Sequence, residues 1–350
     1  MLSRRSLLTV AASASVPLAA RSGRAAGRFE GRTIRVQFWG GSDGLVIRKY
    51  IVDPFVKETG ARVVVEEGNT SASIAKVRAQ KADPQLDVIF LDDVGVFTLE
   101  REGVLERLDS SKMPNAADVF SGYVVADGHG IGIFNYITTL LYNPTKGAAP
   151  TSWSDLWDPK YKGKVLSPSI NDTQALLFTL MAARFGGGSL DDLDPAWPKL
   201  EAFRPQVYAF LENRALNAEA LENGEAALAV DIPYYFKPYI DRGYHIGMTT
   251  DLKEGYFSIT GSAALVKGGK GDREVAYAFI NQALSPQAQA GLGRELWYGP
   301  TNPKTQLPPE VASYMVHTPD QFRAAVQFDR LKLVEKRPEI IERWNRIMVR

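Results

Sequence analysis

The chain has 350 residues, with 41 lysines and arginines against 40 aspartates and glutamates, 45% hydrophobic residues and no cysteine. The lack of cysteine excludes a disulfide framework, a thiolate metal site and a thiol nucleophile, so burial of apolar side chains must stabilise the fold. The balanced charge gives no sign of nucleic-acid binding, and the length suffices for two domains of ordinary size.

The N-terminal segment has the composition of an export signal. Arg4 and Arg5 precede an apolar run that continues to about Ala20. This run is too short to span a bilayer, and paired arginines followed by Ser-Leu-Leu resemble a twin-arginine signal. We therefore expect residues 1–26 to be a cleaved, twin-arginine-like signal peptide and the mature protein to be periplasmic; a buried N-terminal helix is the alternative. Cleavage near Ala26 leaves 37 basic residues against 40 acidic ones.

After this segment, strand and helix patterns alternate. Extended, largely apolar patterns occur at 34–39, 62–66 and 86–91, and helical patterns occur at 45–59 and around 74–80. This β-α-β-α-β order predicts a doubly wound α/β sheet, with a ligand crevice at the carboxyl ends of its strands. The residues expected in that crevice are 39–43, 68–71 and 91–94.

Two further apolar, extended segments, 132–143 and 256–267, bracket a middle region with its own helix and strand patterns. We predict that they form a two-strand hinge between two doubly wound lobes. Lobe one would comprise 27–137 and 263–350, and lobe two would be the inserted segment 138–262. The strongly helical residues 319–350 are expected to place C-terminal helices on lobe one, where they serve for packing.

Four motifs in this order resemble the periplasmic solute-binding proteins of ABC importers, of the polyamine and ferric-iron types. They are Trp-Ser-Asp-Leu-Trp-Asp-Pro at 153–159, Glu-Asn-Gly-Glu-Ala-Ala-Leu-Ala at 222–229, Tyr-Phe-Ser-Ile-Thr-Gly-Ser at 256–262 and Arg-Pro-Glu-Ile-Ile-Glu-Arg-Trp-Asn at 337–345. The resemblance runs over the whole mature chain. It implies a type II periplasmic binding fold, a monomer without cofactor, and delivery of a small-molecule solute to a membrane permease with a separate ATPase.

For the polyamine type, the resemblance implies aromatic rings against the methylene stem and carboxylates against each ammonium group. Near 256–262, however, the usual tryptophan and aspartate of that type are replaced by Ile259 and Gly261. A shorter amine or a γ-amino acid therefore fits better than a long diamine held at both ends. The expected ligand-binding residues are Trp39, Asp92, Asp93, Tyr136, Asn171, Asp172, Asp231, Tyr234, Tyr235 and Tyr256.

The ferric-iron type remains an alternative. In that type, an adjacent tyrosine pair follows a Gly-Glu, and here Tyr234 and Tyr235 follow Gly-Glu225. Phenolate and carboxylate oxygens are suitable ligands for a hard cation, so Asp92, Tyr234 and Tyr235 are the alternative iron ligands, with Asp43 as a further oxygen donor. Other small organic solutes are a third possibility.

The same residues also have purely structural interpretations. Trp39 can pack under the first lobe, and either Asp92 or Asp93 can cap the helix that follows them. Asp172 can likewise be a helix cap, and Tyr234 can begin a helix with its ring buried.

An enzyme is the competing class of function, because two-lobed α/β clefts also host catalysts. The sequence has no nucleophile elbow and no phosphate-binding glycine loop, and its three histidines, at 129, 245 and 317, show no metal-ligand spacing. We therefore predict a receptor without catalytic activity.

Overall fold

The structure is a computed structural model that describes residues 27–349. The predicted signal peptide lies outside the described residues. No helix within 27–349 combines the length and the apolar character that crossing a bilayer requires.

The first part of the described chain confirms the predicted alternation. Three strands, β1 (Thr33–Phe38), β2 (Arg62–Glu67) and β3 (Val88–Asp92), pair in parallel in the order β2-β1-β3. The predicted helix at 45–59 is built from α1 (Gly41–Ile47), a π-helical turn (Arg48–Val52) and α2 (Asp53–Thr59) in succession. Helices α3 (Thr70–Ala79) and α4 (Asp93–Arg101) follow β2 and β3.

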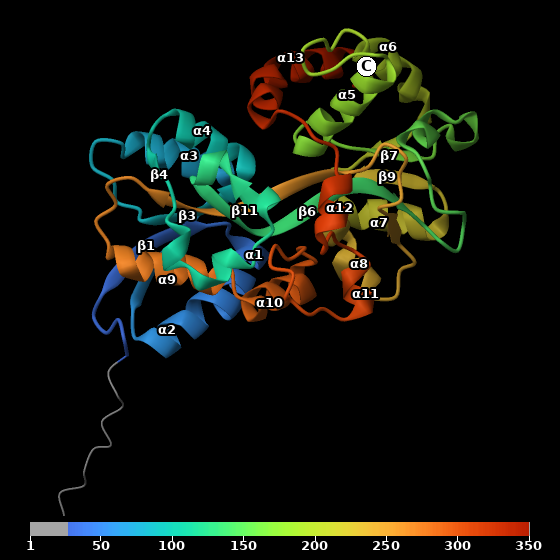
Figure 1. Ribbon diagram of the computed structural model, residues 1–350. Coiled ribbons are helices and arrows are strands. Elements are labelled where there is room, and N and C mark those ends of the chain that lie inside the picture. The colour runs from blue at the N-terminus through green and yellow to red at the C-terminus, as the bar shows by residue number, and fades with distance from the viewer. Residues whose placement is uncertain (1–26, 350) are drawn as a thin grey trace, which may run out of the picture.

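The sheets are mixed, because two long antiparallel strands join the parallel ones. Strand β11 (Phe257–Val266) pairs with β3 on one side and with β6 (Gly130–Tyr142) on the other, antiparallel in both cases. The far end of β6 pairs antiparallel with β9 (Leu228–Asp231) and β10 (Gly247–Thr249). Strand β9 then pairs in parallel with β7 (Val165–Ser167), and β7 with β8 (Val207–Phe210). Figure 1 shows β6 and β11 running across the middle of the molecule. The two segments predicted to be extended are therefore strands, and the description "doubly wound" applies only to the parallel parts.

Two short strands extend the sheet, since β4 (Leu105–Glu106) pairs with β11 and β5 (Val124–Val125) pairs with β6. The remaining α-helices are α5 (Thr173–Phe185), α6 (Ala196–Phe203), α7 (Arg214–Asn223), α8 (Lys237–Ile240), α9 (Arg273–Ala283), α10 (Pro286–Leu296), α11 (Pro309–Ala312), α12 (Pro319–Ala324) and α13 (Arg330–Met348).

Two large groups of buried side chains stabilise the two ends of the molecule. The first core lies around β1, β3 and β11 and the helices α2, α9 and α10, where the rings of Phe90 and Phe279 stack with centroids 5.8 Å apart. The second core lies around α5 and α6, where the rings of Phe178 and Phe203 meet edge to face at 4.7 Å. The two halves of the fold thus have separate cores.

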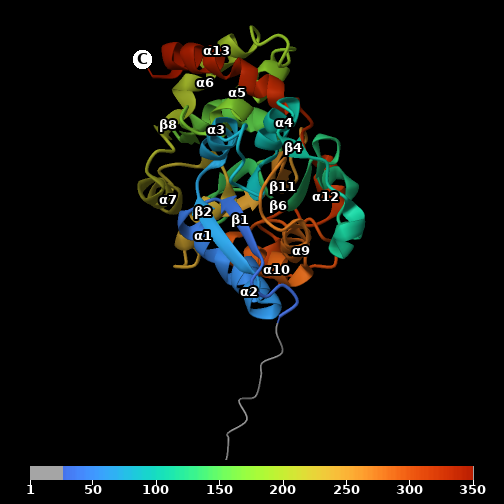
Figure 2. The ribbon, with the colours of Figure 1, turned by 90° about the vertical axis from the view of Figure 1, so that its left-hand side faces the viewer.

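The position of the last helix, α13, differs from the position expected from the sequence. Helices α9 and α10 pack on the first core as expected, but α13 contributes Leu333, Ile340 and Trp344 to the second core. Figures 1 and 2 both show α13 beside α5 and α6. Helix α13 also contacts α4 of the first half, through the ion pairs Arg330–Asp93 and Arg101–Glu335. The prediction that the C-terminal helices lie on lobe one therefore holds only in part for α13, whose buried stripe packs in the second core. An apolar stripe indicates that one helix face is buried, and it does not indicate which surface covers that face.

Candidate functional site

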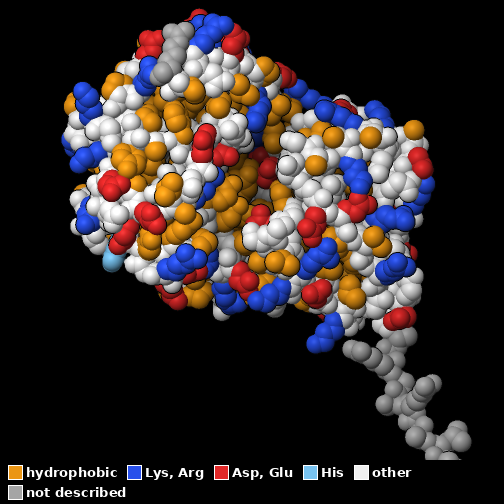
Figure 3. All heavy atoms as spheres, turned by 180° about the vertical axis from the view of Figure 1, so that it is seen from behind, with side chains coloured by type: hydrophobic (Ala, Val, Ile, Leu, Met, Phe, Trp, Pro, Cys, Tyr) orange, Lys and Arg blue, Asp and Glu red, His pale blue; other side chains and the backbone are white. Residues whose placement is uncertain are grey.

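A cavity of about 410 Å³ lies where the carboxyl ends of β1 and β3 face the start of α5. Its walls come from both halves of the fold, since Trp39 and Asp92 adjoin the first core whereas Thr173 and Gln174 begin the α5 helix of the second. Seen from behind in Figure 3, the surface is hollowed between the two halves, with hydrophobic and acidic side chains gathered there. The carboxyl edge of a parallel sheet is the place where α/β folds bind ligands.

Six aromatic side chains form much of the cavity wall: Trp39, Phe134, Tyr136, Tyr234, Tyr235 and Tyr298. The rings of Phe134 and Tyr298 stack with centroids 4.2 Å apart, and those of Tyr234 and Tyr235 lie 4.4 Å apart. The indole of Trp39 packs on Phe134 at 5.4 Å. Such a wall offers π faces to a cation.

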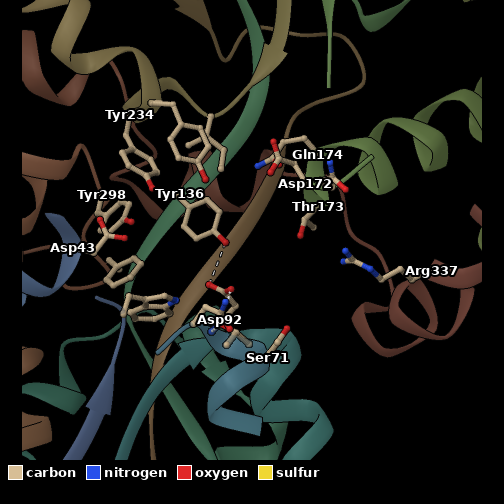
Figure 4. Close-up of a pocket in the computed structure, with 17 residues that line it drawn as sticks. Asp43, Ser71, Asp92, Tyr136, Asp172, Thr173, Gln174, Tyr234, Tyr298 and Arg337 are labelled. Carbon is tan, nitrogen blue, oxygen red and sulfur yellow. Dashed lines mark hydrogen bonds between the residues drawn. The ribbon is translucent and has the colours of Figure 1, made fainter. Parts of the chain in front are cut away.

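Asp92, the last residue of β3, directs its carboxylate into the cavity. One oxygen accepts a 2.8 Å hydrogen bond from the Thr70 hydroxyl, and the other accepts one of 3.1 Å from the Tyr136 hydroxyl (Figure 4). Asp92 occupies the N-cap position of α4, but its side chain does not cap the helix. No lysine or arginine among the described residues forms an ion pair with it. The carboxylate is thus oriented by neutral donors and keeps its negative charge uncompensated.

A second carboxylate, Asp43 of α1, lies beside Tyr298 in Figure 4. Its Oδ1 atom is buried without a hydrogen-bond partner among the described residues. A buried oxygen of this kind costs free energy unless a ligand satisfies it. Asp43 and Asp92 are therefore the two anionic groups of the cavity that have no cationic partner.

Burial raises the pKa of both carboxyl groups from 3.8 to about 6. A hydrogen bond with Tyr298 opposes this rise at Asp43, and one with Thr70 opposes it at Asp92.

Because these pKa values are higher in the folded than in the unfolded chain, the folded state binds more protons between about pH 4 and 6. Stability of the ligand-free protein should therefore fall as pH rises through this window. The measurement is the urea unfolding midpoint from pH 4 to 8, and an Asp43→Asn/Asp92→Asn double variant should show a flatter profile over that window. An equally steep profile in the double variant would contradict this assignment.

Asp172, Arg214 and Asp231 form a charge network behind the tyrosine pair. The Arg214 guanidinium lies 2.9 Å from an Asp172 oxygen and 3.3 Å from an Asp231 oxygen, and its carbon lies 4.1 Å from the centroid of the Tyr235 ring. Burial raises the pKa of Asp231, whereas Arg214 acts in the opposite direction. The network holds Asp172 at the cavity edge, and its one guanidinium is shared between two carboxylates.

Seven of the ten predicted binding residues line the cavity. They are Trp39, Asp92, Tyr136, Asn171, Asp172, Tyr234 and Tyr235. The structure thereby gives both members of the tyrosine pair a cavity-facing position, although Tyr234 also packs against the first core. Their position is consistent with ligand binding, which stays a prediction.

Three predicted residues do not belong to this set. Asp93 is buried in an ion pair with Arg330 at 2.8 Å, and Asp231 is paired with Arg214 and only 1% exposed. Tyr256 is buried under α12, where its hydroxyl donates to the Gln321 carbonyl. Each of these side chains already has a partner within the protein, so their assignment as ligand contacts is corrected.

Several residues that were not among the expected binding residues also line the cavity: Phe134, Gln174, Ile232, Tyr298 and Arg337. Tyr298 lies in a Gly-Pro-rich turn and Arg337 on α13, both far along the chain from the strands that define the crevice. Both carried a signal in the sequence, because Arg337 begins one of the family-like motifs and Tyr298 begins a turn-rich stretch that returns towards the cleft in the family that the chain resembles.

Metal binding would require the tyrosines. Among residues 27–349, no three His, Asp or Glu side chains are grouped so as to hold a metal ion. Burial raises the pKa values of Tyr136, Tyr234 and Tyr298, so these phenols are neutral unless a cation displaces their protons.

The fold has two halves with separate cores and an aromatic, acidic cavity between them. This arrangement is typical of a receptor that binds a ligand in a cleft between two lobes. The chain belongs to the bacterial extracellular solute-binding proteins, whose family model matches residues 50–318. It is thus a solute-binding, non-enzymatic component of an ABC importer, as the sequence motifs predicted.

Its relatives bind different ligands. The chain is 25% identical to the spermidine/putrescine-binding periplasmic protein of Escherichia coli K12, over 77% of this chain and 79% of that protein. It is 24% identical to the iron uptake protein A1 of Synechocystis, over 74% of each chain. It is 23% identical to the gamma-aminobutyric acid-binding protein of Pseudomonas aeruginosa, over 92% of each.

Among solved structures, the chain is similar to an ABC transporter protein from Clostridium perfringens. The TM-score is 0.78 at 26% identity, and the match covers 90% of this chain and 99% of that one. This similarity confirms the periplasmic-binding-protein type of α/β fold.

Proposed function

We propose that the protein captures a small organic amine in the periplasm and delivers it to the membrane permease and ATPase of an ABC importer. The observation that carries this proposal is the pair of carboxylates, Asp43 and Asp92, which have no cationic partner and lie within an aromatic wall. A ligand ammonium group would supply the missing positive charge. Relatives that bind polyamines or γ-aminobutyric acid support an amine ligand.

The physical argument concerns the cost of burying charge. An ammonium group loses its hydration in a cavity of this kind, and only a nearby carboxylate and π faces can offset that loss. Asp92 is already oriented by Thr70 and Tyr136, so little side-chain entropy is lost when the ligand binds. We infer that contacts made from both halves at once favour a closed arrangement, with β6 and β11 as the hinge between lobe one and lobe two.

Ferric iron is the second candidate, because oxygen donors gather at one end of the cavity. The ring of Tyr234 lies 4.4 Å from that of Tyr235 and 5.3 Å from that of Tyr298, measured between centroids, and Asp43 adjoins them. Hard oxygen ligands of this kind suit Fe³⁺. The raised phenol pKa values oppose this candidate, since iron would first have to displace the protons.

The two candidates give opposite results in one experiment. Purified mature protein is titrated by calorimetry with 1,4-diaminobutane, 4-aminobutanoate and ferric citrate, and its visible absorption is recorded. We expect heat and a thermal shift with an amine, about 2.7 kcal/mol of added stability at a ligand concentration 100 times the dissociation constant, and no colour. A Tyr234→Phe/Tyr235→Phe variant should retain much of its amine binding.

A visible absorption band that appears with iron and disappears in this double variant would instead establish the iron receptor. The matched control is Tyr208→Phe. Tyr208 is exposed and its hydroxyl donates a hydrogen bond to Glu225, outside the cavity. Removing this hydroxyl should therefore change the binding of neither the amine nor iron.

A further inference from the structure

We propose that the cavity has a distinct anion-binding end, formed by the start of α5, Gln174 and Arg337, and that its ligand is a zwitterionic ω-amino acid. This inference rests on the amine proposal above and specifies the other end of the ligand. The ammonium group would lie at Asp43 and Asp92, and the carboxylate would lie across the cavity. Figure 4 shows Thr173, Gln174 and Arg337 on the side away from Asp43.

The first observation is an uncapped helix start. Helix α5 has 13 residues, and the side chain of its N-cap residue, Asp172, makes no capping hydrogen bond. That carboxylate turns instead to Arg214. Within the described chain, the backbone N–H groups of Thr173 and Gln174 have no hydrogen-bond acceptor. Free N–H groups at a helix N-terminus, with the helix dipole behind them, bind anions.

The second observation is the side chain of Gln174. It is only 5% exposed and lines the cavity, and no hydrogen bond joins its amide to another described residue. The amide is therefore free to bond at the cavity wall, and a ligand carboxylate would accept from its NH₂ group. This free donor points to a polar ligand at the start of α5.

The third observation is Arg337 of α13. Its guanidinium faces the cavity in Figure 4, and no carboxylate within residues 27–349 forms an ion pair with it. Two other arginines that contact acidic residues of this region differ in this respect, because Arg214 is paired with Asp172 and Asp231, and Arg330 with Asp93. Arg337 is therefore the cation available to a ligand anion.

Both charged groups of a zwitterion find a partner in the cavity. The Arg214 guanidinium is shared between Asp172 and Asp231, so neither of these carboxylates needs the ligand for its only cation. Asp43 and Asp92 are available to an ammonium group, and Arg337 is available to a carboxylate. Arg337 would also repel the second ammonium group of a diamine, which disfavours that ligand.

The test uses matched ligands on the purified mature protein. Calorimetry compares 4-aminobutanoate, 5-aminopentanoate and 6-aminohexanoate with the monoamine of equal length and with 1,4-diaminobutane. We expect at least one amino acid to bind about 10- to 100-fold more tightly than its monoamine, which is the usual value of a charge-assisted contact. Arg337→Gln should remove about tenfold of amino-acid affinity and change monoamine affinity less than about twofold.

A second variant makes the test independent of Arg337. Gln174→Glu places a carboxylate at the proposed anion end, so it should weaken the amino acid and strengthen the diamine. Melting temperatures of both variants verify that they fold. Tighter binding of 1,4-diaminobutane than of any amino acid, with no penalty in Arg337→Gln, would overturn the anion end and leave the amine proposal standing. Binding of ferric iron and of no amine would overturn both.

Discussion

Replacement of Asp92 by asparagine is expected to abolish amine binding, with a loss of affinity of about 100-fold or more. The substitution keeps the shape and one acceptor oxygen, for the Thr70 or the Tyr136 hydroxyl. It removes the negative charge and places an NH₂ donor at the position of the other oxygen. The ligand ammonium would then enter the cavity with Asp43 as its remaining counter-ion. Calorimetric titration with the amine that binds best to the wild type measures the loss.

The same variant should not lose stability without ligand. Burial raises the pKa of Asp92, which means that the ionised carboxylate is unfavourable in the folded protein at neutral pH. A neutral asparagine avoids that cost, so the ligand-free variant should melt at or above the wild-type temperature at pH 7.5. Function and stability thus oppose each other at this residue.

A control variant separates local charge from total charge. Asp127→Asn removes one negative charge from an exposed side chain, 84% accessible and only loosely paired with Arg107 at 3.4 Å. Its affinity for the amine should equal that of the wild type. Unchanged binding in Asp92→Asn, or an equal loss in Asp127→Asn, would refute the role given to Asp92.

Replacement of Arg214 by methionine is expected to destabilise the protein by about 3–5 kcal/mol. Arg214 is the partner of Asp231, whose side chain is 1% exposed, and it also holds Asp172. Methionine fills part of the volume and leaves the Asp231 carboxylate buried without a cation. Urea unfolding at pH 7.5 measures the change in the free energy of unfolding.

Two comparisons test the cause of that loss. Adding Asp231→Asn to Arg214→Met should restore most of the stability, because the uncompensated charge is gone. Arg28→Met removes an exposed ion pair with Glu274, with side chains 71% and 52% accessible, and should cost no more than about 1 kcal/mol. A loss in Arg214→Met as small as that in Arg28→Met would show that the network is energetically unimportant.

The pH dependence of Arg214→Met follows from the same pair. Burial raises the pKa of Asp231, and loss of the guanidinium removes the interaction that opposes this rise. The destabilisation should therefore decrease as the pH is lowered and Asp231 becomes protonated.

Much of the fold was predictable because its signals are local. The strands at 33–38, 62–67 and 88–92 follow from short apolar runs bounded by turn residues, and their alternation with helices predicts a parallel sheet. The cleft position follows in turn, since ligand sites lie at the carboxyl edge of such sheets. Trp39 and Asp92 could be named from sequence for this reason alone.

The roles of individual acidic residues depended on tertiary partners. Asp92, Asp93 and Asp231 all follow apolar strands and look equivalent in sequence. The structure separates them, because Arg330 neutralises Asp93 and Arg214 neutralises Asp231, whereas Asp92 receives only neutral hydrogen bonds. Arg330 lies 237 residues from Asp93 along the chain, and Arg214 lies 17 residues from Asp231. No local sequence pattern therefore indicates these pairs.

The sequence alone thus determined the family, the α/β alternation and the edge of the sheet where we expect the ligand, because hydrophobic period and motif order are properties of consecutive residues. Only the tertiary structure decided which core α13 covers, which carboxylates stay uncompensated, and that Gln174 and Arg337 meet the cleft. Those outcomes depend on contacts between distant segments, where the free energy of burial and charge pairing is set by neighbours in space.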